Sequence, residues 1–242
     1  MRIPRIYHSQ PLVVGTVIAL EADAANHVGR VLRLQEGHNI ELFCGDNHSY
    51  SACISAASKK HVEVRVESKV AASVESPLQV HLVQGISRGD RMDFTLQKAV
   101  ELGVSSITPV FTERCGVKLQ GERLEKKQLQ WQKIVIAACE QSGRNLVPTV
   151  HTAVTLDTYL DNADRPQTLT LEPSAEYSLK SAPVAQELAL LIGPEGGFSA
   201  AEIERTRQAG CIAVRLGPRV LRTETAALTA LAALQANHGD LV

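Results

Sequence analysis

The sequence lacks the cysteine patterns that stabilise small secreted domains or bind zinc. Its five cysteines are scattered, odd in number and never spaced as a C-x-x-C pair. A disulfide framework would be denser, and a zinc site needs clustered Cys and His ligands. The cysteines are therefore interpreted as small buried hydrophobic residues, and we expect no bound metal.

Long apolar runs are missing as well. No uncharged apolar stretch approaches the roughly 20 residues that cross a bilayer. The first six residues carry charge but begin no apolar segment of signal-peptide length. We therefore expect a cytoplasmic protein with no membrane association, and 242 residues allow one large core or two unequal domains.

A strong excess of positive charge is also absent, because the formal net charge is −1. The chain as a whole therefore has no electrostatic attraction to nucleic acid. Lys and Arg outnumber Asp and Glu within residues 76–150, whereas the acidic residues are in excess within 151–242. Any RNA binding must therefore use local patches, or a patch assembled from two subunits.

The first 70 or so residues predict a small β-rich module. Strands are expected at 11–20, 39–44, 49–57 and 61–66, with a helix at 23–34 between the first two. Closely spaced strands with turn residues favour a small β-barrel-like module. The small, polar segment 69–77 ends in Pro77 and predicts a linker.

Beyond this linker, predicted strands and helices alternate. The expected strands are 78–84, 104–111, 168–172, 188–192 and 211–216, and the expected helices are 92–102, 126–142, 200–208 and 223–236. Such alternation predicts an α/β domain with a mostly parallel sheet covered by helices on both faces. In such sheets, ligands bind beyond the carboxyl ends of the strands.

One predicted strand end carries three glycines in the five residues Gly193 to Gly197, and Ser199 and Glu202 follow with the spacing of a capping box. The loop matches neither G-x-G-x-x-G nor G-K-[ST], and Glu195 would repel a phosphate. S-adenosylmethionine has no phosphate, carries a sulfonium and an ammonium group, and fits better. Taken alone, the loop favours a simpler interpretation, a tight turn with a solvated glutamate.

A second strand end, Leu216-Gly-Pro-Arg-Val-Leu-Arg-Thr-Glu-Thr-Ala226, places Arg219 and Arg222 before the last predicted helix. That helix is rich in alanine and almost uncharged after Glu224. It is interpreted either as packed against the sheet or as a dimer interface. Two Gly-Pro strand ends so close in sequence are a more specific sign of a ligand site than either one alone.

These segments resemble the SPOUT superfamily of RNA methyltransferases, and more closely the family that methylates ring N3 of a uridine in bacterial 16S ribosomal RNA. The long matches are Leu191-Ile-Gly-Pro-Glu-Gly-Gly197 and Leu216 to Thr225. Shorter ones are 97–103, 138–144, and His27 with 31–33. Together they extend over nearly the whole chain.

The resemblance implies a PUA-like RNA-binding β-barrel in residues 1–70 and a SPOUT domain with a trefoil knot in residues 76–242. It also implies a homodimer, S-adenosylmethionine as cofactor, and 16S ribosomal RNA of the small ribosomal subunit as substrate. Two alternatives remain open: a methyltransferase acting on ribose 2′-oxygen, and a non-catalytic RNA-binding factor in ribosome assembly.

Carried over by position, the cofactor contacts implied by the resemblance are Leu171, Glu172, Ile192, Gly193, Pro194, Glu195, Gly196, Gly197, Leu216, Gly217, Val220, Leu221, Arg222, Thr223 and Thr225. Residue 172 is often His in the family, so side-chain contacts from Glu172 are in doubt.

Deprotonation of uracil N3 needs a base and stabilisation of the resulting anion. Arg222 and Glu224 are hypothesised as the catalytic pair, with Arg219 and Glu195 as the other candidates. The alternative for Glu224 and Arg222 is a structural role at the start of the helix.

The basic residues expected to contact RNA are Arg5, His27, Arg30, Arg33, Arg88, Arg91 and Arg144. Arg30 and Arg33 would share one face of the predicted helix and reach neighbouring phosphates. Solvated surface charge is the alternative for each of them, and a core position is a further alternative for His27.

Overall fold

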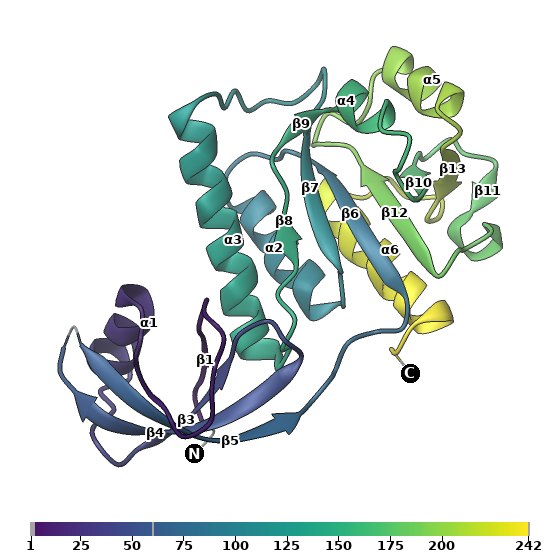
Figure 1. Ribbon diagram of the computed structural model, residues 1–242. Coiled ribbons are helices and arrows are strands. Elements are labelled where there is room, and N and C mark those ends of the chain that lie inside the picture. The colour runs from purple at the N-terminus through teal and green to yellow at the C-terminus, as the bar shows by residue number, and fades with distance from the viewer. Residues whose placement is uncertain (1–2, 60, 242) are drawn as a thin grey trace. The chain divides into compact units, whose positions relative to one another are not determined.

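The computed structural model describes residues 3–59 and 61–241 (Figure 1). Its internal contacts divide the chain into two compact units. The N-terminal unit comprises the residues up to Glu75 together with Cys139–Val147, and the C-terminal unit comprises Ser76–Ala138 and the residues from Pro148 onward. Each unit is described separately below.

The N-terminal unit contains a five-stranded sheet in the order β1-β3-β4-β5-β2. Its strands are β1 Arg5–Tyr7, β2 Val17–Ala19, β3 Asn39–Phe43, β4 His48–Ala57 and β5 Val62–Ala71. Strand β1 pairs parallel with β3, and the other pairings are antiparallel. Val62, Val64 and Val66 alternate into the core, as the period of two predicts.

The helix predicted over residues 23–34 is wrong in its second half. Helix α1 covers only Ala22–Asn26, and a π-helix follows at His27–Val31. Arg33 lies beyond it with a positive φ of 55°. Arg30 and Arg33 therefore do not share a face of one α-helix, because the backbone changes geometry between them.

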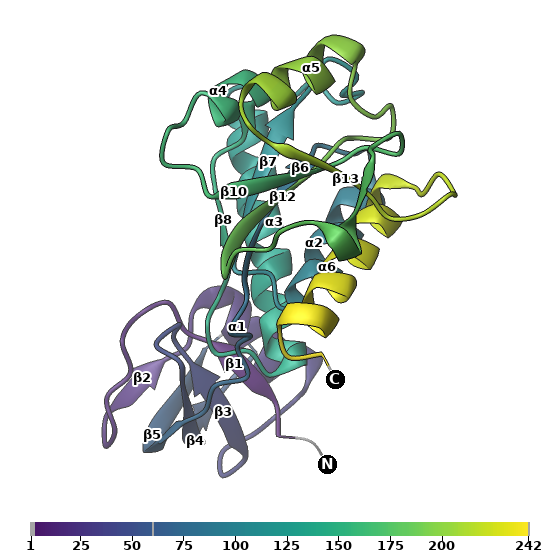
Figure 2. The same ribbon diagram turned by 90° about the vertical axis from the view of Figure 1, so that its right-hand side faces the viewer.

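The C-terminal unit contains an eight-stranded sheet with the order β11-β13-β10-β12-β6-β7-β8, and β9 pairs with β7 (Figure 2). The strands are β6 Gln79–Gly85, β7 Ser106–Phe111, β8 Thr149–Val150, β9 Val154–Thr155, β10 Gln167–Leu171, β11 Tyr177–Ser178, β12 Glu187–Ile192 and β13 Ile212–Arg215. All of their pairings are parallel, which confirms the predicted α/β class.

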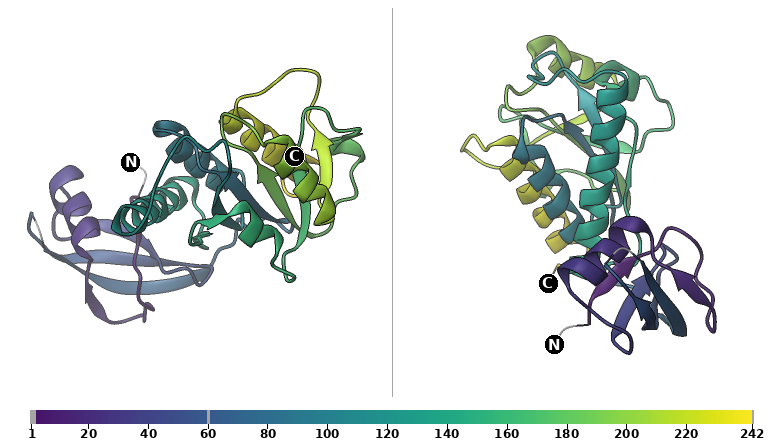
Figure 3. Two further views of the ribbon diagram at one scale, coloured as in Figure 1. Left: turned by 90° about the horizontal axis from the view of Figure 1, so that it is seen from above. Right: turned by 90° about the vertical axis from the view of Figure 1, so that its left-hand side faces the viewer.

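Helices lie on both faces of this sheet. They are α2 Asp90–Glu101, α3 Glu122–Ser142, α4 Leu156–Leu160, α5 Ala200–Gln208 and α6 Thr223–His238, with a 3-10 turn at Leu179–Ser181. Val83, Val110 and Leu191 form one core cluster with residues of α4 and α5. Helices α2 and α6 run side by side, and α6 also packs against β12 (Figure 3).

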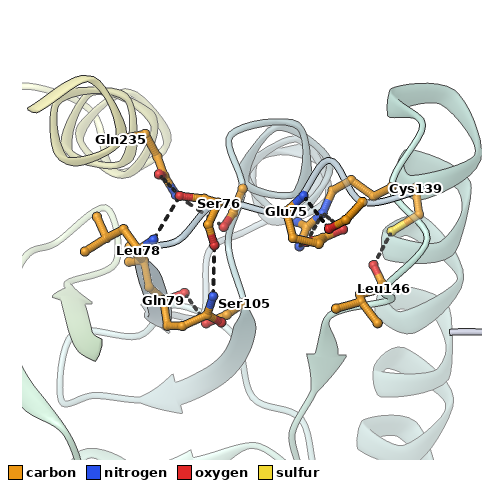
Figure 4. A network of polar contacts seen from close by, with 12 residues as sticks. Glu75, Ser76, Leu78, Gln79, Ser105, Cys139, Leu146 and Gln235 are labelled. Atoms are coloured by element: carbon orange, nitrogen blue, oxygen red, sulfur yellow. Dashed lines mark hydrogen bonds and ion pairs between the residues drawn. The ribbon is translucent and has the colours of Figure 1, made fainter. Parts of the chain in front are cut away.

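A buried glutamine fixes the carboxyl-terminal half of α6 (Figure 4). Gln235 is fully buried and accepts a hydrogen bond from the Ser76 hydroxyl at 2.6 Å. Its Nε2 donates to the Gly103 carbonyl at 3.3 Å, and Ser76 Oγ also accepts from the Leu78 N–H at 3.1 Å. One side chain therefore joins α6 to Ser76, shortly before β6, and to Gly103, just after the end of α2.

We expect Gln235→Leu to lower the free energy of unfolding by about 1–3 kcal/mol, because it leaves the half-buried Gly103 carbonyl and the buried Ser76 hydroxyl without this partner. In a domain of this size the melting temperature falls by roughly 2–4 °C per kcal/mol. Asn237→Ala, on the exposed side of the same helix, serves as the control and should change little. Equal melting temperatures for the two variants in a thermal scan would contradict this role of Gln235.

Candidate functional site

A cavity of about 580 Å³ opens at the carboxyl ends of β10, β12 and β13. These strands are parallel neighbours, so their carboxyl ends meet at one edge of the sheet. The lining comprises Arg91, Arg114, Leu171, Glu172, Pro173, Ile192, Gly193, Pro194, Glu195, Gly196, Gly197, Phe198, Ile203, Val214, Arg215, Leu216, Gly217, Arg219, Val220, Leu221, Arg222, Thr223, Glu224 and Ala226.

The structure therefore brings together the segments 193–197 and 216–224. Every residue expected to contact the cofactor lies in the lining except Thr225, which is exposed on α6. The catalytic candidates Arg219, Arg222, Glu195 and Glu224 line the cavity as well.

Two arginines of the lining, Arg91 and Arg114, were not predicted to lie at the cavity. Arg91 was expected to contact RNA, and Arg114 was not singled out at all. Each follows the carboxyl end of a central strand, β6 or β7. The same rule about strand ends, applied to every predicted strand, finds both of them.

The start of α5 shapes one side of the cavity as predicted. Ser199 Oγ accepts from the Glu202 N–H at 3.2 Å, and the Ser199 N–H donates to Glu202 Oε2 at 2.8 Å. This reciprocal pair confirms the capping box. Glu202 Oε1 also accepts from the Glu113 N–H at 2.8 Å, so the segment after β7 is bound to the start of α5.

A glycine on the neighbouring strand β6 allows the first loop to approach closely. A Cβ built on Gly85 would lie 2.5 Å from Pro194 N and 2.8 Å from the Gly193 carbonyl carbon. Both contacts are with backbone, which cannot move aside as a flexible side chain can. Only glycine fits at position 85 without displacing the loop.

Thr223 joins the two cavity-forming segments. Its buried hydroxyl donates to the Gly193 carbonyl at 2.6 Å and accepts from Gln84 Nε2 at 2.9 Å. The first residue of α6 is thereby bonded to the end of β12 and to β6. Three pieces of chain that are distant in sequence are held in one arrangement by a single side chain.

Hydrogen bonds from three arginines hold the loop 193–197 in place. The backbone N–H of Arg88 donates to Glu195 Oε1 at 2.8 Å, and Arg91 Nη1 donates to the same oxygen at 3.1 Å. Arg114 Nη1 donates to the Gly196 carbonyl at 3.1 Å. Burial opposes ionisation of Glu195, but these hydrogen bonds and the Arg91 charge outweigh it and lower the pKa of its carboxyl group.

The remaining charged side chains of the cavity differ in whether they form ion pairs or hydrogen bonds within the protein. Glu224 Oε1 lies 4.0 Å from Arg91 Nε, whereas Glu224 Oε2 is buried with no hydrogen-bond partner among the described residues. The side chains of Arg219 and Arg222 are exposed and form no ion pair or hydrogen bond within the part of the chain that is described. These groups are therefore available to a ligand.

Glu172 is already neutralised. Its buried carboxylate accepts from Arg207 Nη2 at 3.0 and 3.2 Å and from Ser174 Oγ at 2.6 Å. The carboxylate of Glu172 is therefore occupied by partners of its own, which agrees with the doubt about side-chain contacts from this position to the cofactor.

The basic residues expected to contact RNA fall into separate groups. His27, Arg30 and Arg33 are exposed in the N-terminal unit, so the core interpretation of His27 is wrong. Arg88 and Arg91 are in the C-terminal unit, where both contact Glu195.

Arg5 and Arg144, which were expected to contact RNA, have partners inside the N-terminal unit. Arg144 is buried and donates from Nε to Glu75 Oε2 at 3.0 Å. Arg5 bonds to Glu41, to the Arg144 carbonyl at 3.1 Å and to Asn145 Oδ1 at 2.8 Å. Charges satisfied inside the fold are poorly placed to bind phosphates.

Residues 3–59 and 61–241 contain no group of three or more His, Cys, Asp or Glu side chains arranged to hold a metal ion. Within the same ranges no helix has both the length and the apolar character needed to cross a membrane.

Comparison with known proteins gives two family matches. Residues 74–235 match an RNA methyltransferase domain, and residues 20–67 match an RNA methyltransferase PUA domain. Among named relatives, the ribosomal RNA small subunit methyltransferase E of Buchnera aphidicola (strain Sg) is 38% identical over 99% of this chain and 98% of its own. The Bacillus subtilis protein of that name is 31% identical over 93% and 92%.

Two solved structures are similar over the full length of both chains. A methyltransferase from Legionella pneumophila, in complex with the cofactor SAM, has 46% identity and a TM-score of 0.97. The ribosomal RNA small subunit methyltransferase E from Neisseria gonorrhoeae, bound to S-adenosylmethionine, has 41% identity and a TM-score of 0.95.

Proposed function

The chain belongs to the RNA methyltransferase family, and we propose that it transfers a methyl group from S-adenosylmethionine to ring N3 of a specific uridine in 16S ribosomal RNA of the small ribosomal subunit. The observation that carries the proposal is the cavity formed jointly by segments 193–197 and 216–224 and held together through Thr223. Its position at the strand ends is that of a ligand site in a parallel sheet.

The residues of this cavity fit S-adenosylmethionine. Gly193, Gly196 and Gly197 present backbone without side chains, and Ile192 and Leu216 add apolar surface. Arginines line the cavity as well, and the carboxylates of Glu195 and Glu224 suit a ligand with sulfonium and ammonium charges. When bound, the cofactor supplies an electrophilic methyl group on its sulfonium sulfur.

The proposed cofactor contacts remain those of the family comparison, with Glu172 limited as described above. They are Leu171, Glu172, Ile192, Gly193, Pro194, Glu195, Gly196, Gly197, Leu216, Gly217, Val220, Leu221, Arg222, Thr223 and Thr225. The bonds from Thr223, Arg91 and Arg114 hold the loop 193–197 in place, which supports the positioning that methyl transfer requires.

On the substrate side, the uracil N3 edge is also the Watson–Crick edge, so the target uridine must be unpaired or flipped out to react. The N3 proton must leave as the new bond forms. We assign Arg222 to stabilise the negative charge that develops on a uracil carbonyl, since its guanidinium is free at the cavity.

Glu224 is the better candidate for the proton acceptor. Its Oε2 has no partner among the described residues, whereas Glu195 Oε1 is already bonded to Arg88 and Arg91. A carboxylate whose pKa is lowered by such bonds is a weaker base. Glu195 is therefore assigned to holding the loop, and Arg219 to contacts with RNA.

The family resemblance also leads us to propose a homodimer, a trefoil knot at the C-terminal end and a cytoplasmic location. An apolar surface supports the dimer: Phe94 of α2 is 46% exposed, α2 packs against α6, and residues 225–237 of α6 carry no charge. His27, Arg30 and Arg33 are proposed to contact RNA from the PUA-like unit.

Nucleoside digests of 16S ribosomal RNA from cells with and without this protein test the activity. We expect mass spectrometry to find N3-methyluridine at one position only when the protein is present. A methyl group on ribose instead would indicate the 2′-O alternative. Identical digests would indicate a non-catalytic assembly factor and would overturn the proposal.

A further inference from the structure

A second, smaller cavity adjoins the first. Its volume is about 430 Å³, and it is lined by Pro173, Arg215, Gly217, Pro218, Arg219 and Val220. All of these except Pro218 also line the larger cavity, so the two share a wall at the carboxyl end of β13. A ligand group in the smaller cavity would therefore lie directly beside a ligand in the larger one.

The two cavities differ in charge. Three glutamates and five arginines, Arg215 and Arg219 among them, line the larger one, whereas the ionisable side chains in the lining of the smaller one are Arg215 and Arg219 alone. With no carboxylate to neutralise them, two guanidinium groups create a positive potential there. The smaller cavity therefore favours an anion.

The two arginines are held differently. Arg215 Nη1 donates to the Ala175 carbonyl at 2.6 Å and also to the Glu176 carbonyl. These neutral acceptors fix the guanidinium without cancelling its charge. Arg219 is exposed and has no partner among the described residues, so its full set of donors can turn to a ligand.

We propose that the smaller cavity binds a backbone phosphate of the RNA next to the target uridine, with Arg219 as the direct contact and Arg215 as a fixed neighbouring charge. This rests on the proposed function, because it assumes an RNA substrate. Arginine forms paired hydrogen bonds with phosphate oxygens, and such contacts fix the register of a nucleic acid on a protein. The carboxylate of the cofactor is the other nearby anion, but it would fill only a small part of this volume.

The salt dependence of RNA binding distinguishes the two anions. Each phosphate contact on single-stranded nucleic acid contributes about 0.7 to the slope of log affinity against log salt concentration. With an unmodified 16S ribosomal RNA transcript as the probe, Arg219→Gln should weaken binding roughly tenfold and reduce the slope by about 0.7. Arg219→Lys should keep the slope, because it keeps the charge.

Arg123→Gln is the matched control, because Arg123 is exposed on α3 and lines neither cavity. The affinity for S-adenosylmethionine, measured by calorimetry, should be the same in all variants. If Arg219→Gln behaves like the control in RNA binding, the phosphate site is overturned. If only its cofactor affinity falls, the cavity belongs to the cofactor carboxylate, and the proposal is again overturned.

A separate measurement tests the proposed function independently of the phosphate site. Methyl transfer by the unaltered protein to the same transcript is measured alongside the binding curves. If no methyl group is transferred while the slope still falls in Arg219→Gln, the phosphate site stands and the assigned reaction does not.

Discussion

Arg222→Ala should reduce methylation of 16S ribosomal RNA at least about a hundredfold, a much larger factor than any loss of affinity for S-adenosylmethionine, while the melting temperature stays near that of the unaltered protein. The guanidinium lines the cavity and bonds to no described residue, so its removal leaves no buried partner unsatisfied. A hundredfold loss is the usual result of removing one electrostatic stabiliser of a developing charge.

Single-turnover rates with saturating RNA measure this effect, and calorimetry measures cofactor binding. Arg123→Ala, an exposed arginine outside both cavities, provides the comparison. If Arg222→Ala turns over as fast as Arg123→Ala, Arg222 has no part in the chemistry. If its rate and cofactor affinity fall by the same factor, Arg222 binds the cofactor rather than stabilising the uracil anion.

Gly85→Ala should reduce the affinity for S-adenosylmethionine by about tenfold or more. The added methyl group would lie 2.5 Å from Pro194 N, and the loop 193–197 must move to relieve the overlap. Forcing one extra carbon into a packed site costs about 1–3 kcal/mol. Because the loop is part of the cavity wall, we expect most of that cost to appear in ligand binding, where 1.4 kcal/mol is tenfold.

Gly29→Ala separates this effect from general destabilisation. A Cβ on Gly29 would lie 2.3 Å from the Ser58 carbonyl oxygen, an overlap of similar severity in the N-terminal unit. We expect both variants to melt at lower temperature, but only Gly85→Ala to lose cofactor affinity in calorimetry. Unchanged affinity in a folded Gly85→Ala protein would show that the loop tolerates the shift.

Long periodic elements could be predicted from the sequence, and short ones could not. Helix α5 was predicted over 200–208 as it is found, because the capping box at Ser199 marks its start. Strands β8, β9 and β11 have two residues each, too few to show a period. The π-helix at His27–Val31 was missed because its residues also fit an α-helical pattern.

The cavity-forming segments could be located because Gly-Pro at a strand end is visible in the sequence. The bonds that join them could not be, since Thr223 meets Gly193 and Gln84 only through the order of the sheet. Strand β6 lies beside β12 although about a hundred residues separate them in sequence. Gly85 could not be singled out from the sequence either, because it approaches the loop 193–197 only through this pairing of β6 with β12.

The pairing of Glu75 with Arg144, and of the Ala72 carbonyl with Asn145 Nδ2 at 2.6 Å, makes residues 139–147 a structural component of the N-terminal unit. A protein truncated after residue 75 would keep its sheet but leave this carboxylate and this carbonyl without their partners. Excising the N-terminal unit by one cut would therefore yield a weakened fragment. Supplying the 139–147 peptide in trans, or by a designed short linker, would restore the missing contacts.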